Sequence, residues 1–176
     1  MTLKSFLLAG VLAVLLVPAA SGQDTAKIAP FRVFSPAFEN EGQIPKKFGC
    51  GGENVNPPLR MENIPPGTKS MALLLDDLDA PRGTYVHWIL WNLPPATGEI
   101  RENSVPGGAV QGTNDFKKQN YGGPCPPTRP HRYVFKVYAL DTFLDLGPGA
   151  TMPDLEKAIR GHVLAQAQLK GSYSKK

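Results

Sequence analysis

The pattern of apolar and polar residues predicts a protein built mainly from short β-strands. Met71–Leu75 is an unbroken apolar run of the length expected for a buried strand, and Tyr85–Leu93 contains a second. His131–Leu140 alternates in the manner of a half-buried strand. Phe31–Phe34 is the predicted first strand, which the following Ser-Pro pair ends.

One helix is predicted near the end of the chain. Thr151 is a suitable N-cap with Asp154 three residues later, and Gly171 supplies a stop. The residues between them that recur at helical spacing are Leu155, Ala158, Ile159, His162, Ala165 and Leu169. On this interpretation His162 packs on the apolar face of the helix.

Long segments rich in glycine and proline separate the predicted strands. Glu39–Asn63 and Gly98–Asn120 are expected to be ordered loops with at most short strands. Tyr121–Pro127 cannot lie inside a strand or helix, because proline removes a backbone donor and fixes φ. The chain holds 18 Gly and 18 Pro, which favours many turns between strands over a helical bundle.

The N-terminal residues have the three-part pattern of a secretory signal peptide. Lys4 supplies a positive charge, Phe6–Val17 is apolar, and small residues at 19–22 suit cleavage after Gly22. We therefore expect a signal peptide over residues 1–22 and a single domain over 23–176 that is secreted or periplasmic. An uncleaved N-terminal anchor is the alternative.

Charge and cysteine content narrow the class of protein. Lys and Arg number 19 and Asp and Glu 15, a net charge of +4 without the clustered basic residues typical of nucleic-acid binding. The sequence contains no basic amphipathic helix of the kind that attaches a protein to a bilayer. Two cysteines in an exported chain favour a disulfide between Cys50 and Cys125.

Candidate chemistry gathers where the predicted strands begin and end. Asp76, Asp77 and Asp79 follow the strand that ends near Leu75, while His87 and His131 each follow a loop rich in proline and glycine. If these strand ends converge, they form a site from Asp77, Asp79, His87, His131 and Tyr133, bordered by N–H groups near Gly123. Two imidazoles, a phenol and backbone amides suit a small oxyanion such as phosphate.

Three alternatives stay open at this point. The acidic residues could form an Asx-rich turn that only caps a strand. Two histidines and an aspartate could bind iron or zinc, although no H-x-H or H-x₃-H pair is present. A Ser–His–Asp hydrolase would need a nucleophile, and the sequence has no G-x-S-x-G motif. Binding, without catalytic residues, cofactor or metal, is the favoured interpretation.

A set of short motifs resembles the phosphatidylethanolamine-binding protein family, which includes Raf kinase inhibitor proteins and plant flowering regulators. The resemblance runs from Phe31 to Tyr173 and is strongest for the bacterial and archaeal branch. The motifs are Asn54–Leu59, Asp77–Pro81, His87–Trp88, Asn92–Pro94, Asn114–Phe116, Tyr121–Pro127, His131–Tyr133 and Gly161–Ala165.

The resemblance implies a mainly β fold, a Greek-key-like sandwich of two antiparallel β-sheets with a C-terminal helix. It also implies a small pocket at one end that binds phosphate-type or phospholipid head-group ligands. By position, Asp77, His87, His131 and Tyr133 line that pocket, with Gly123 near the anion and Asp79 bracing the loop. Cis peptide bonds are expected before Pro81 and, as a second candidate, before Pro127.

Departures from the family pattern limit what the resemblance implies. Leu78 replaces a proline of the acidic motif, Cys125 replaces a glycine, and the extra tyrosine-bearing helix of the animal members is missing. The expected function is therefore an exported, Raf kinase inhibitor-like protein that binds a small anionic ligand, with no nucleic-acid partner and no stable membrane insertion after signal cleavage. The alternative is an inhibitor of a protease or kinase that acts through a surface loop, for which Gly98–Asn120 is the candidate segment.

Overall fold

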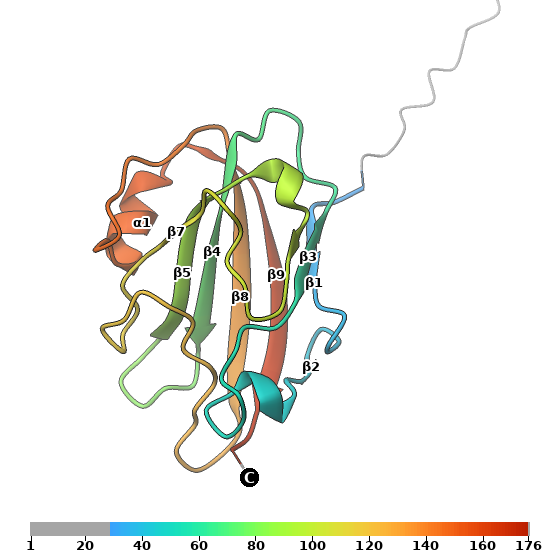
Figure 1. Ribbon diagram of the computed structural model, residues 1–176, viewed down its shortest axis with the longest axis vertical. Helices are drawn as coiled ribbons and strands as arrows, with labels where there is room; N and C mark the ends of the chain where they lie inside the picture. Colours follow the sequence, from blue (N-terminus) through green and yellow to red (C-terminus); the bar gives the residue numbers. More distant parts are fainter. Residues whose placement is uncertain (1–28, 176) are drawn as a thin grey trace, which may run out of the picture.

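The computed structural model describes residues 29–175, which form two β-sheets and one short α-helix (Figure 1). The predicted mainly β fold is confirmed. In chain order the strands are β1 (Arg32–Phe34), β2 (Gly42–Gln43), β3 (Leu59–Glu62), β4 (Ser70–Asp77), β5 (Tyr85–Leu93), β6 (Glu99–Ile100), β7 (Val110–Gln111), β8 (His131–Leu140) and β9 (Val163–Tyr173). The helix α1 is Met152–Ala158, and two 3₁₀ turns lie at Lys46–Phe48 and Pro95–Thr97.

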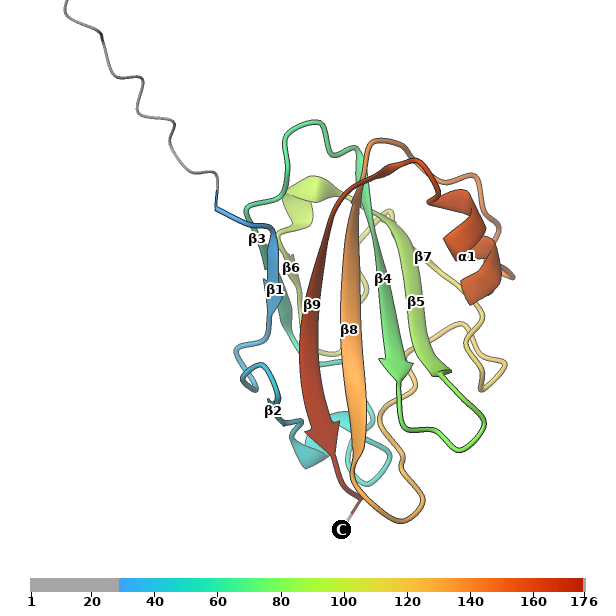
Figure 2. The same cartoon turned by 180° about the vertical axis from the view of Figure 1, so that it is seen from behind.

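The larger sheet has six strands in the order β2-β9-β8-β4-β5-β7, and the smaller has three in the order β1-β3-β6. Figure 2 shows the long strands β9, β8, β4 and β5 side by side, with α1 beside β5. Neighbouring strands are antiparallel except β2 and β9, which pair in parallel over two residues. Among the strands of residues 29–175, the sandwich therefore departs from a purely antiparallel one only at this short edge strand.

The buried side chains form two clusters, one on each face of the larger sheet. Leu73 and Leu75 of β4 belong to the cluster shared with the smaller sheet. Ala72 and Leu74 point the other way and pack with Leu155 of α1. Because both of its faces are covered, β4 is buried along its whole length, which explains the unbroken apolar run.

The long C-terminal helix predicted from the sequence is wrong. Helix α1 begins as expected, with a capping box between Thr151 and Asp154, but it ends at Ala158. Gly161, at φ +80°, turns the chain into strand β9, which pairs with β8 along its length. Pairing between β8 and β9 and burial of alternate residues such as Leu169 outweigh the helical spacing. His162 is accordingly an exposed turn residue, with Nδ1 2.8 Å from a carboxylate oxygen of Asp141.

The signal peptide predicted for residues 1–22 lies outside the described residues. Within residues 29–175, none of the helices is long and apolar enough to cross a bilayer.

Candidate functional site

The end of β4 and the beginnings of β5 and β8 meet at one end of the larger sheet, at the bottom of Figure 1. Asp77 pairs with Tyr85 of β5 on one side and with Tyr133 of β8 on the other. Since side chains alternate along a strand, His87 shares a face with Tyr85, and His131 shares one with Tyr133. The structure thus brings Asp77, His87 and His131 together.

The Asp77 carboxylate is the centre of this group. It is buried, and its Oδ2 lies 2.7 Å from Nδ1 of His131 and 4.0 Å from Nε2 of His87. Its Oδ1 accepts a hydrogen bond of 2.9 Å from the backbone N–H of Asp79. A buried carboxylate needs such partners to offset its lost hydration, and here they also fix its orientation.

Hydrogen bonds fix which nitrogen of each imidazole carries a proton. Nδ1 of His131 faces the Asp77 carboxylate and donates to it. Nδ1 of His87 lies 2.8 Å from the carbonyl oxygen of Gly122 and must donate to it as well. The Nε2 atom of each ring is therefore the one left to accept a proton.

Burial disfavours the charged form of His87 and lowers its pKa below the ordinary 6.5. The carbonyl of Gly122 and the negative charge of Asp77 act in the opposite direction. Rings of Tyr85, Phe116 and Tyr133 surround the imidazole edge-to-face, with centroids 5.1–5.5 Å away. The folded protein without a ligand therefore favours a neutral His87.

A pocket of about 170 Å³ opens over these groups. Its lining residues are Asp77, Ala80, Pro81, Tyr85, His87, Phe116, Cys125, Pro127 and His131. Sequence reasoning gave no role to Tyr85 or Phe116, although the spacing of Tyr85 and His87 along one strand places both on one face.

Three predicted site residues, Tyr133, Gly123 and Asp79, are not among those that line this pocket. Tyr133 is fully buried behind His87, and within the described residues its hydroxyl has no hydrogen-bond partner. Burial and the charge of Asp77 raise the pKa of this phenol, so it stays protonated. Gly123 lines a neighbouring pocket of about 130 Å³, and its N–H donates to the Asn54 side chain at 2.8 Å. That N–H is not available to an anion, contrary to the expected site.

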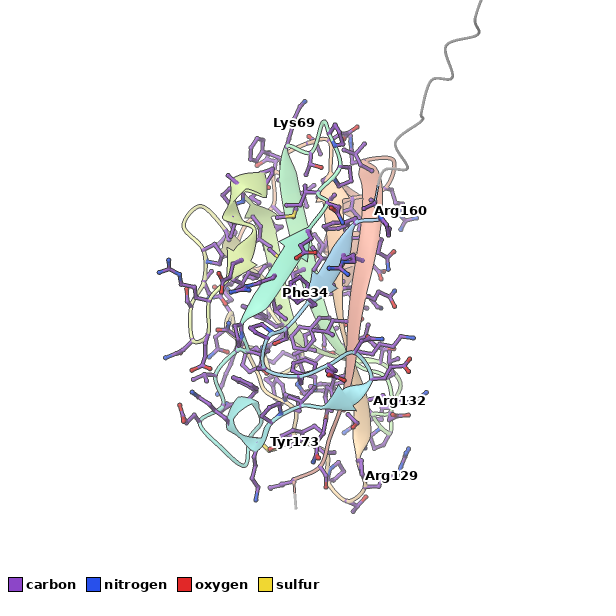
Figure 3. The ribbon with its side chains drawn as sticks, turned by 90° about the vertical axis from the view of Figure 1, so that its right-hand side faces the viewer. Phe34, Lys69, Arg129, Arg132, Arg160 and Tyr173 are labelled. Carbon is purple, nitrogen blue, oxygen red and sulfur yellow. A yellow bond between two sulfur atoms is a disulfide. The ribbon has the colours of Figure 1, made fainter. Side chains whose placement is uncertain are left out.

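Asp79 braces the loop, as the family resemblance implied. Its carboxylate accepts two hydrogen bonds from the Arg132 guanidinium, at 2.7 and 2.8 Å, and one from the Arg132 backbone N–H at 2.8 Å. These bonds hold the pKa of Asp79 well below its ordinary value. Figure 3 shows Arg132 at this end of the molecule together with Arg129.

The cis peptide bonds expected before Pro81 and Pro127 are wrong, because the described residues contain none. The N–H of Gly83 donates to the carbonyl of Ala80 at 3.1 Å, which puts Pro81 at the second position of a β-turn. A trans proline suits that position, and the turn closes with Gly83 at φ +99°. Pro127 is exposed, and its trans bond is the form that X–Pro bonds ordinarily prefer.

The predicted disulfide between Cys50 and Cys125 is confirmed, and it joins two loops beside the pocket. Hydrogen bonds reinforce the link: the N–H of Cys50 donates to Pro124, and the Tyr121 hydroxyl donates to the carbonyl of Phe48. Cys125 itself lies in the pocket wall. The wall is thus fixed by covalent and hydrogen bonds to a segment 75 residues away.

The remaining carboxylate of the acidic motif serves the other side of the sheet. Asp76 is fully buried and its Oδ2 lies 2.6 Å from Nζ of Lys136. Burial raises its pKa, and the bond to Lys136 opposes that shift. Asp76 therefore does not belong to the pocket.

This arrangement can bind and exchange a proton with a small oxyanion. Two imidazole Nε2 atoms remain available beside one buried carboxylate, and protonation converts each into a cationic donor. The metal alternative gains no support from the side chains, since the described residues contain no group of three or more potential ligands in suitable positions. Protonation of His87 would add one positive charge to this pocket, next to the Asp77 carboxylate.

Known proteins are similar to this chain in sequence over most of its length. A UPF0098 protein of Methanothermobacter thermautotrophicus is 47% identical over 142 residues, covering 78% of this chain and 94% of that protein. A UPF0098 protein of Pyrococcus horikoshii is 48% identical over 151 residues, covering 81% of this chain and 76% of the relative.

Two solved structures are similar over almost their whole length. The crystal structure of a phosphatidylethanolamine-binding protein homologue from Chlamydia trachomatis matches with a TM-score of 0.81 and 38% identity, covering 84% of this chain and 99% of that one. Escherichia coli YbcL, described as a new member of the mammalian family, matches with a TM-score of 0.77 and 32% identity, covering 83% and 99%. The model of the family named phosphatidylethanolamine-binding protein matches residues 34–174, so the chain belongs to that family.

Proposed function

We propose that this protein binds a phosphate-type anion, either free or as part of a phospholipid head group, in the pocket over Asp77. The observation that carries the proposal is the buried Asp77 carboxylate beside both imidazoles, 2.7 Å from Nδ1 of His131 and 4.0 Å from Nε2 of His87. Membership of the phosphatidylethanolamine-binding protein family supports the same ligand class.

Charge balance explains how such a pocket would accept an anion. Asp77 accepts a hydrogen bond from Nδ1 of His131 and faces Nε2 of His87, so a proton taken up by His87 together with an incoming anion would lie beside the carboxylate and offset its negative charge. Because burial lowers the pKa of empty His87, binding would be coupled to proton uptake there. Affinity for phosphate would then weaken as the pH rises above neutral.

We further propose that the protein acts by binding and not by catalysis, and that it is exported. Both cysteines are joined in the disulfide, so neither is a thiol nucleophile. The Nδ1 atoms of the pocket histidines contact Asp77 and the Gly122 carbonyl, not a serine or threonine hydroxyl. A disulfide is typical of oxidising compartments, which agrees with the predicted signal peptide.

Calorimetric titration with inorganic phosphate, phosphoethanolamine and a nucleotide tests the proposal. His131→Ala removes one charge-assisted hydrogen bond and should weaken phosphate binding about 10- to 100-fold, and His87→Ala should do likewise. The matched control is His162→Ala, which changes an exposed histidine outside the pocket and should leave binding unchanged. A folded wild-type protein that binds none of the three ligands, or a His131→Ala variant that binds phosphate normally, would contradict it.

A further inference from the structure

Another hollow shares no lining residue with the proposed anion pocket. It has a volume of about 230 Å³, and half of its ten lining residues are asparagine or glutamine. These amide residues are Asn54, Asn56, Asn103, Gln111 and Asn120. None of the lining residues carries a charge, so this amide pocket differs in chemistry from the site over Asp77.

Asn56 forms the frame of the amide pocket and is not available to a ligand. Its Nδ2 donates to the carbonyls of Arg101 and Pro57, and its Oδ1 accepts from the N–H of Ser104 at 3.0 Å. These bonds fix the loop that carries Asn103 against the loop that carries Asn54. The walls are therefore rigid without any ligand.

Two further side-chain amides, on Asn54 and Gln111, accept hydrogen bonds through their oxygen atoms and leave their NH₂ groups without a partner within the described residues. Oδ1 of Asn54 accepts from the N–H of Gly123 at 2.8 Å, and Oε1 of Gln111 accepts from the indole N–H of Trp88 at 2.9 Å. Within the described residues, neither side-chain NH₂ group donates to the protein. The carbonyl of each amide is thus fixed, and its two N–H donors are presented in a defined orientation.

The remaining amides, on Asn103 and Asn120, make no side-chain hydrogen bond within the part of the chain described, so each offers a donor and an acceptor. Asn54 and Asn103 also have positive φ angles, 58° and 50°. Such backbone conformations cluster at binding sites, although asparagine tolerates them well. Aromatic side chains of Trp88 and Tyr121 lie below, packed edge-to-face with ring centroids 5.4 Å apart.

The chemistry of the amide pocket favours one class of ligand. A neutral lining gives no electrostatic attraction to phosphate, and the neighbouring acidic residues Glu53 and Glu102 are both paired with Lys47. Side-chain amides, which both donate and accept, match hydroxyl groups, which do the same. The volume is below the range of about 300–1,000 Å³ typical of drug-sized ligands, which suits a single ring.

We propose that the pocket framed by Asn54, Asn103, Gln111 and Asn120 is a second binding site, for one neutral saccharide ring. The site is independent of the proposed anion function, because none of its residues lines the pocket over Asp77. A peptide backbone also presents donors and acceptors, and it is the competing ligand that the test separates.

The two tryptophans provide a direct readout. In ¹H–¹⁵N spectra each gives one indole signal: Trp88 donates to Gln111 in the amide pocket, whereas Trp91 belongs to the buried cluster beneath α1. Glucose, galactose, mannose, N-acetylglucosamine and ribose are titrated at millimolar concentration into the oxidised, ¹⁵N-labelled protein, with triglycine and inorganic phosphate as separate probes. We expect at least one sugar to shift the Trp88 indole and the pocket NH₂ signals while Trp91 stays unchanged.

The double variant Asn103→Gly/Asn120→Ala tests the assignment. Glycine keeps the positive φ at residue 103, and neither side chain has a hydrogen-bond partner within the described residues, so the variant should fold. Loss of two hydrogen bonds should weaken sugar binding about tenfold or more, while Gln168→Ala, an exposed amide on β9, should bind as wild type. No shift with any sugar, a shift with triglycine alone, or equal sugar affinity in the double variant would overturn the proposal. Each of these outcomes leaves the anion proposal untouched, because phosphate binding is measured separately.

Discussion

Asp76 and Asp77 are neighbours in sequence, but their side chains lie on opposite faces of strand β4. Asp77 points into the pocket with His87 and His131, whereas Asp76 pairs with Lys136 next to the cluster beneath α1. The alternation of side chains along a strand separates them. A motif of adjacent acids in a strand therefore holds one binding residue and one structural residue.

Lys136→Met should be strongly destabilising. Asp76 is fully buried and its Oδ1 already has no hydrogen-bond partner in the described residues, so removing Lys136 leaves a buried charge unpaired. Breaking such a pair typically costs about 3–5 kcal/mol. The free energy of unfolding in urea, compared between Lys136→Met and the double variant Asp76→Leu/Lys136→Met, measures this cost. A double variant that is no more stable than the single one would contradict this explanation.

His87 should make the ligand-free protein less stable in mild acid. Burial lowers its pKa in the folded state below 6.5, so the unfolded chain binds more protons as the pH falls past that value. The contribution of neutral His87 is fully present above pH 6.5 and is lost as the pH falls toward the folded-state pKa. Acidic groups such as Asp76 titrate as well, so a matched variant is needed.

The measurement is the free energy of unfolding of wild type and His87→Asn between pH 7.5 and about 5. Asparagine retains a donor toward the Gly122 carbonyl but does not titrate. The wild type should lose more stability than the variant across this range in phosphate-free buffer. Parallel pH profiles for the two proteins would show that His87 is not held neutral by burial.

At the scale of elements, local patterns predicted the long strands well, except for the last strand β9, which was predicted as part of a helix. Tyr85–Leu93 and His131–Leu140 are strands with the predicted limits, because one apolar run or one alternation defines each. The segment after Ile159 contains residues at both helical and strand spacing. The outcome depends on Gly161 and on pairing with β8, which is a contact between distant parts of the fold.

The disulfide links the two loops beside the pocket, and removing it should mainly affect stability. Replacing both Cys50 and Cys125 with serine releases a loop closed over 75 residues, which costs up to about 4 kcal/mol. The hydrogen bonds from Tyr121 to Phe48 and from Gly123 to Asn54 remain, so the fold should persist. Chemical denaturation should show the same loss in free energy of unfolding for the variant and for the reduced wild type. Unchanged stability in both would contradict a stabilising role of the disulfide.

For the whole molecule, the sandwich places every component of the candidate anion site at one end of the larger sheet. The family resemblance implied that Asp77, His87 and His131 line one pocket, whereas their places at strand ends alone left the convergence conditional. The resemblance could not show that the Gly123 N–H is bonded to Asn54, because that contact joins two irregular loops. The amide pocket was missed for the same reason.

The most direct test of the anion site uses the three histidines of the chain as reporters. Two of them, His87 and His131, line the pocket, and the third, His162, lies in an exposed turn outside it. Imidazole ¹H–¹⁵N signals are followed while inorganic phosphate is titrated at pH 6.5. Phosphate bound as proposed will shift the imidazole signals of both pocket histidines, that of His87 toward the imidazolium form, and leave His162 unchanged. Shifts confined to His162, or none at all in the folded protein, would contradict a phosphate site over Asp77.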